Sequence, residues 1–248
     1  MGRSRRRLWI QPIESGFRLY VRPPHYGRLH FALLWVLRAL MLSHGGAMMH
    51  GAVLKHKQHS LMLMGRKMIG KTQLVLALMN RGWQLLAEDK FLFLDGHAWC
   101  LQDHFFLRNH HIERSPELAD NAILTKRKLP WVKPAQWQLH VESQFPGQLN
   151  MQQQPTTIAW LTQGSDYRYS PISPQALYQA ILTQQRQAFS AFLPLDGWYG
   201  LEPKLPAGLP LNHGHHLELP VPLDCQRGCQ LLLDSLISNP SVRETLRE

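Results

Sequence analysis

The residues with the clearest chemical pattern lie between positions 65 and 72. They fit G-x-x-x-x-G-K-[ST], the pattern of a phosphate-binding loop: Gly65, Arg66, Lys67, Met68, Ile69, Gly70, Lys71 and Thr72. In such a loop the glycines let backbone N–H groups point at phosphate oxygens. The lysine then adds a positive charge, and the threonine hydroxyl is placed to bind Mg²⁺. The alternative is a glycine turn that binds nothing.

The surroundings of this loop favour the phosphate-binding interpretation. An apolar run, Leu61 to Met64, precedes the loop and predicts a buried strand, and Gln73 to Asn80 continues as a helix. A helix that opens at Lys71 adds free backbone amides and the positive end of its dipole. We therefore predict that the chain binds a nucleoside triphosphate.

Two further features flank the loop. His50-Gly51 precedes the strand that leads into it, and Glu88-Asp89 follows the helix after it. In folds with such loops, a neighbouring strand brings an acidic residue to the magnesium. An adjacent pair allows one carboxylate to hold the metal while the other faces the acceptor hydroxyl as general base. The alternatives are a solvated turn for the acidic pair and a structural role for the histidine.

The order of His50-Gly51, the loop, Arg81-Gly82 and the acidic pair resembles the catalytic domain of HPr kinase/phosphorylase. That domain belongs to the phosphoenolpyruvate-carboxykinase-like proteins with phosphate-binding loops, and the resemblance extends from His50 to about Leu94. It implies an α/β fold with a central mixed β-sheet flanked by helices. It also implies a kinase that transfers the γ-phosphoryl group of ATP to a hydroxyl.

The resemblance also implies a role for each matching residue. Lys71 and the rest of the loop bind phosphates, and Thr72 with Asp89 holds Mg²⁺. Glu88 takes the catalytic acid/base position, and His50 assists that carboxylate or the γ-phosphate. The acceptor hydroxyl belongs to a serine of a protein or peptide, or to a small molecule.

Two departures from the family favour an alternative function. Glu88 stands where the family has aspartate, and Arg66 and Lys67 bring two extra cations into the loop. These features are also compatible with a nucleotide-binding regulatory or scaffold protein with weak catalysis or none.

The composition bounds the class of protein. The 248 residues predict a single domain over 1–248, with residues 1–16 as a basic, poorly ordered tail. Three cysteines predict no disulfide framework and a cytoplasmic location. The net charge of +10 indicates an acidic partner, but no element that reads nucleic acid is present. A homo-oligomer is compatible with the sequence.

No membrane span is expected, because the apolar run Phe31 to Leu42 is short and is interrupted by Arg38. The predicted strands are 17–21, 47–54, 60–64, 84–87, 91–94 and 157–162, with further strand between 97 and 107. The predicted helices are 29–43, 73–80, 175–192 and 224–238.

Other candidate residues lie outside this framework. The region from Asn109 to Pro155 is predicted to be irregular, and its basic cluster Lys126 to Lys128 is a candidate for docking an acidic substrate. Arg108 could reach a phosphate or an acceptor, although a surface salt bridge is the commoner role of such an arginine.

Overall fold

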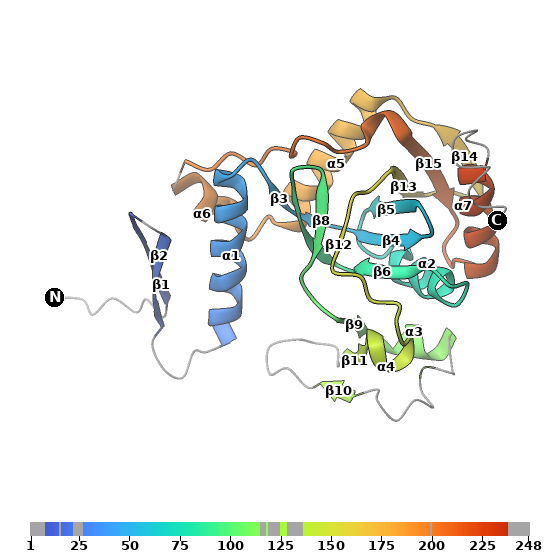
Figure 1. The fold of residues 1–248 in the computed structure, drawn as a ribbon, viewed down its shortest axis with the longest axis horizontal. Coiled ribbons are helices and arrows are strands. Elements are labelled where there is room, and N and C mark those ends of the chain that lie inside the picture. The colour runs from blue at the N-terminus through green and yellow to red at the C-terminus, as the bar shows by residue number, and fades with distance from the viewer. Residues whose placement is uncertain are drawn as a thin grey trace.

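The computed structural model describes residues 8–14, 16–21, 27–114, 118, 125–127, 136–198 and 200–237, which form a mixed α/β fold (Figure 1). The strands are β1 (Leu8–Ile13), β2 (Gly16–Val21), β3 (Ala47–His50), β4 (Ala52–His56), β5 (His59–Gly65), β6 (Gln84–Ala87), β7 (Lys90–Leu94), β8 (His97–Cys100), β9 (His104–Leu107), β10 (Thr125–Arg127), β11 (Gln136–His140), β12 (Gln152–Gln153), β13 (Thr157–Gln163), β14 (Arg168–Pro171) and β15 (Gly214–Leu219). The helices are α1 (Gly27–Ser43), α2 (Lys71–Met79), α3 (Asn109–Arg114), α4 (Val141–Gln144), α5 (Pro174–Ala188), α6 (Leu193–Trp198), the 3₁₀ turn η2 (Leu211–His213) and α7 (Cys225–Ile237). Among these helices, none combines the length and apolar character needed to cross a bilayer.

The largest sheet has six strands in the order β14-β15-β13-β5-β4-β6. Its centre is parallel, with β13 between β5 and β15, and its other pairs are antiparallel. A second, antiparallel sheet has the order β12-β8-β7-β3. The expected mixed sheet flanked by helices is therefore present, with a smaller sheet beside it.

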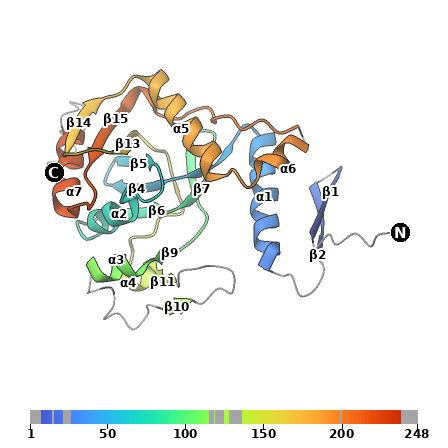
Figure 2. The same ribbon diagram turned by 180° about the vertical axis from the view of Figure 1, so that it is seen from behind.

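Alternating side chains of β5 explain the layers. Leu61 and Leu63 point into a core shared with α2 and α7, whereas Met62 and Met64 point into a core shared with α5 and β7. This alternation follows from the two-residue period of a strand whose two faces are both buried. Figures 1 and 2 show α2 and α7 on one face of the six-stranded sheet and α5 on the other.

Two of the places where the chain crosses between these two sheets are close to the loop 65–72. Gly51 separates β3 from β4, and Glu88-Asp89 separates β6 from β7. The single strand expected over 47–54 is therefore wrong. Gly51 is needed at its crossing, because a Cβ there would lie 2.7 Å from the carbonyl oxygen of Leu63. Its N–H donates to the carbonyl oxygen of Asp89 (3.2 Å), so the two crossings lie together.

The N-terminal part of the chain also differs from the expectation. Residues 8–13 were expected in a poorly ordered tail, but they form β1, which pairs antiparallel with β2. This pairing satisfies backbone groups that a tail would leave to water. The hairpin lies beside α1 at the end of the molecule remote from α2 and α7 (Figures 1 and 2).

A buried ion pair joins α1 to α6. Arg38 Nη2 lies 2.9 Å from Asp196 Oδ2, and Trp35 Nε1 donates to Asp196 Oδ1 (3.0 Å). Arg38 interrupts the apolar run of this helix in the sequence, and the pairing explains how a charge is tolerated inside it.

The region expected to be irregular contains regular elements in its described part. Strands β10 and β11 lie within it, and they form a third sheet in the order β10-β11-β9. The stretch 97–107, in which further strand was predicted, contains two strands: β8 belongs to the four-stranded sheet and β9 belongs to the third sheet. Buried Leu139 and Val141 anchor the end of β11 in the main core. The side chains of Lys126 to Lys128 lie outside the described residues.

Candidate functional site

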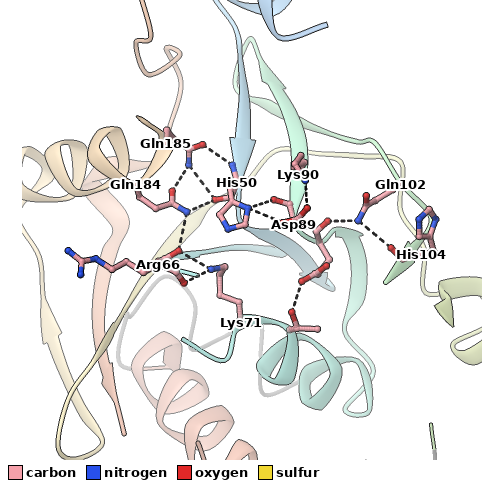
Figure 3. Close-up of polar contacts among 12 residues, drawn as sticks. His50, Arg66, Lys71, Asp89, Lys90, Gln102, His104, Gln184 and Gln185 are labelled. Carbon is pink, nitrogen blue, oxygen red and sulfur yellow. Dashed lines mark hydrogen bonds and ion pairs between the residues drawn. The ribbon is translucent and has the colours of Figure 1, made fainter. Parts of the chain in front are cut away.

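The loop 65–72 connects the end of β5 to the start of α2. Gly65 has φ 145° and an imagined Cβ 2.5 Å from the carbonyl oxygen of Leu161, so only glycine fits at its first position. Lys71 is buried at the other end, and its Nζ donates to the carbonyl oxygens of Gly65 and Arg66 (2.8 Å each). Burial lowers the pKa of Lys71 to about 8, although the charges of Glu88 and Asp89 oppose this shift. The ammonium is thus held inside the loop (Figure 3).

The residues inside the loop differ in their exposure to solvent. Arg66, Lys67 and Met68 are exposed, whereas Ile69 packs into the core beneath α2. Arg108 lies beside the loop, with Nη1 3.0 Å from the sulfur of Met68. The sequence favoured a surface salt bridge for Arg108, and the structure instead places its guanidinium next to the loop.

Glu88 faces the start of α2. Thr72 Oγ1 donates to Glu88 Oε1 (2.6 Å), and the carboxylate is buried. Burial, aided by the charge of Asp89, raises the pKa of Glu88 to about 7, against the opposing effects of the Thr72 hydrogen bond and nearby lysines. A hydroxyl and a carboxylate oxygen in contact are hard donors of the kind that Mg²⁺ prefers.

Asp89 turns the other way and pairs with His50. The Nδ1 atom of His50 lies 3.1 Å from Asp89 Oδ1 and 2.7 Å from the Asp89 carbonyl oxygen. Lys90 Nζ contacts Asp89 Oδ2. Burial alone would raise the pKa of Asp89, but the hydrogen bond from His50 and the charge of Lys90 outweigh it and hold that pKa below its ordinary value. The resemblance implied that His50 assists Glu88 or the γ-phosphate, and in the structure the carboxylate that contacts His50 is that of Asp89.

The contacts of His50 also fix its tautomer. Both partners of Nδ1 are oxygen acceptors, so Nδ1 carries a hydrogen, and in the tautomer with hydrogen on Nδ1 alone Nε2 is an acceptor. Nε2 is buried and has no hydrogen-bond partner among the described residues. A buried acceptor without a hydrogen-bond partner destabilises the folded protein unless a ligand group donates a hydrogen bond to it.

Two glutamines of α5 hold the backbone around the site, and sequence reasoning missed them. Gln184 Nε2 donates to the carbonyl oxygens of His50 and Gly65 (3.0 Å each), so it ties the loop to β3. Gln185 accepts from the N–H of His50 (2.8 Å) and donates to its carbonyl oxygen (3.3 Å). In the sequence they are two polar residues in a predicted helix, and nothing in the sequence indicates that they are buried.

We expect Gln184→Ala to lower the free energy of unfolding by about 1–3 kcal/mol, because two buried carbonyls lose a donor. Gln187→Ala removes an exposed glutamine from the same helix and should change it by no more than about 0.5 kcal/mol. Urea unfolding of the two variants measures the difference. Equal losses would show that the Gln184 side chain does not support the site.

The described residues thus define a mixed α/β protein with a glycine-bounded loop next to two carboxylates and a histidine. No protein-family model matches the sequence, and no curated protein matches it. Among solved structures, the chain is similar to the Hpr(Ser) kinase/phosphatase from Coxiella burnetii, with 16% sequence identity and a TM-score of 0.33. That similarity covers 62% of this chain and 96% of the other.

Proposed function

We propose that the protein is an ATP- and Mg²⁺-dependent kinase that transfers the γ-phosphoryl group to a hydroxyl of a protein or peptide serine or of a small molecule. One observation carries the proposal: the loop, the Thr72–Glu88 contact and the Asp89–His50 contact meet where the chain crosses between the six-stranded and the four-stranded sheet. Phosphoryl transfer depends on positioning and charge stabilisation, and these groups supply both.

Each group has a role in this proposal. Backbone amides of the loop and the ammonium of Lys71 bind the phosphates, and Arg108 lies close enough to the loop to add a second cation. Thr72 and Glu88 hold Mg²⁺, since their oxygens already touch, whereas Asp89 is engaged by His50 and Lys90. When bound, Mg²⁺ neutralises charge on the transferring phosphate. This arrangement exchanges the roles that the family resemblance implied for the two carboxylates.

Asp89 and His50 form the proposed acid/base pair. Asp89 keeps the Nδ1 hydrogen in place and thereby leaves Nε2 free to accept the proton of the acceptor hydroxyl. A carboxylate that orients an imidazole is a recurring solution for activating a hydroxyl.

ATP consumption that depends on a supplied acceptor tests the proposal. The assay uses peptides containing serine and a panel of small alcohols, with calorimetry of MgATP binding on the same protein. Turnover with any acceptor supports a kinase. MgATP binding without turnover across the panel would support the regulatory or scaffold alternative, and the absence of binding would reject both.

We expect the affinity for MgATP to be highest between about pH 7 and pH 8. Burial raises the pKa of Glu88 to about 7, so below that pH a proton competes with the metal. Burial lowers the pKa of Lys71 to about 8, so above that pH the phosphates lose their cation. The association constant should fall by up to about tenfold per pH unit on the acidic limb below pH 7 and on the basic limb above pH 8. Calorimetry from pH 6 to 9.5 measures both limbs.

Two variants separate the two limbs. Glu88→Gln should weaken binding. It should also remove the decrease in affinity below pH 7, apart from the decrease that protonation of ATP itself causes. Lys71→Arg carries a cation that does not deprotonate and should remove the basic limb. A profile that is the same in the wild type and both variants would contradict the assignment.

A further inference from the structure

A second cluster of ligating side chains lies at the end of the β9–β11 ladder. Asp103, His104 and His140 each offer one ligand atom, and these atoms all lie within 4.8 Å of one another. His104 Nδ1 is 2.9 Å from Asp103 Oδ1, and the two imidazole centroids are 5.8 Å apart. We propose that these three residues bind a divalent transition-metal ion of the zinc class.

The backbone brings the three residues together before any ion arrives. His104 and His140 are direct partners in the antiparallel register of β9 and β11, which places their side chains on one face of the sheet. The N–H of Val141 donates to the carbonyl oxygen of Asp103 (2.9 Å) and holds that residue against the end of β11. The cluster therefore requires little reorganisation to close around an ion.

The chemistry of the ligands selects the type of metal. Imidazole nitrogens favour zinc and its neighbours over Mg²⁺ or Ca²⁺, which prefer oxygen alone. His104 is fixed by edge-on packing against Phe106 (4.7 Å between centroids), whereas the His140 ring has no hydrogen-bond partner among the described residues. Two histidines and a carboxylate leave a coordination position for water or for a group of another molecule.

One glutamine connects this cluster to the candidate active site. Gln102 Nε2 donates to the carbonyl oxygens of Glu88 (2.9 Å) and His104 (3.3 Å), as Figure 3 shows for the labelled Gln102 and His104. The zinc-class ion would be held by Asp103, His104 and His140, none of which is assigned to the nucleotide or its Mg²⁺. It is therefore distinct from the Mg²⁺ assigned to the nucleotide, and its binding does not depend on the proposed kinase activity.

Zinc titration of the full chain in excess Mg²⁺, without nucleotide, tests the proposal. Calorimetry should show one Zn²⁺ per chain, and Tm should rise by about 5–10 °C at a hundredfold excess over Kd. His140→Ala, His104→Ala and the exposed Asp103→Asn should each weaken binding by about tenfold or more. The matched control is His213→Ala, which removes an exposed histidine outside the cluster and should leave binding unchanged.

Three results would overturn the proposal. The first is that Zn²⁺ does not bind even at millimolar concentration. The second is that a His104→Ala/His140→Ala double variant keeps the full affinity for Zn²⁺. The third is that His213→Ala, rather than the cluster variants, loses binding. Circular dichroism of each variant distinguishes loss of the site from loss of the fold. Should the histidine variants unfold, Asp103→Asn decides, since its carboxylate is exposed and its removal leaves the core intact.

Discussion

Replacing Lys71 with methionine is expected to lower acceptor-dependent ATP turnover by about 100- to 1,000-fold. The ammonium is the buried cation of the loop, and charge stabilisation is strongest where water is excluded. Methionine keeps the buried stem but no charge. Of the two carbonyl oxygens that Lys71 serves, that of Gly65 retains the hydrogen bond from Gln184. Steady-state kinetics with a saturating acceptor, together with the Kd for MgATP, measures the loss.

Lys67→Met is the matched control for this prediction. Lys67 is in the same loop, but it is exposed, so its charge is screened and its removal should cost no more than about fivefold. Similar losses in the two variants would show that general positive charge, rather than the position of one ammonium, governs activity. Tm values of both variants exclude a simple loss of folded protein.

The strand, loop and helix around Lys71 could be predicted because their signals are local. The apolar run ending at Met64 forms most of β5, and the glycine pattern leads directly into α2 at Lys71. The acidic pair also lies between two strands, as the predicted strands 84–87 and 91–94 indicated. Their participation in nucleotide binding stays a prediction.

The partners of the site residues could not be predicted, because they depend on pairing between distant segments. His50 meets Asp89 rather than Glu88 because the chain leaves one sheet and enters the other at both Gly51 and the acidic pair. The sequence treated 47–54 as one strand, so it could not say which carboxylate His50 faces.

The cluster of His104 and His140 was hidden for the same reason. Its two histidines are brought together by the register of β9 and β11, and β11 lies in a region whose composition predicted irregular structure. By contrast, His215 and His216 are adjacent in the sequence, but in β15 they hydrogen-bond to Tyr169 and Thr162, respectively. Spacing along the chain is therefore a poor guide to ligands gathered across strands.

Replacing Asp89 with asparagine is expected to lower turnover by about 100- to 10,000-fold while leaving the Kd for MgATP within about threefold of the wild type. The amide removes the negative charge that would stabilise the imidazolium formed when Nε2 accepts a proton, whereas the carbonyl oxygen of Asp89 still accepts the Nδ1 hydrogen. The Thr72–Glu88 pair, which we assign to Mg²⁺, is left unchanged. The substitution is compatible with the backbone, because asparagine tolerates the positive φ of 71° at this position.

Asp95→Asn is the control, since Asp95 is exposed, has φ 49° and lies in the turn after β7. It should keep full turnover. His50→Gln should match Asp89→Asn if the two residues act as one unit, and the double variant should lose little more than either single variant. If Asp89→Asn instead lost much of its MgATP affinity while Glu88→Gln kept normal affinity, Asp89 would be assigned as the metal ligand. In that case the assignment implied by the family resemblance would replace the one proposed from the Thr72–Glu88 contact.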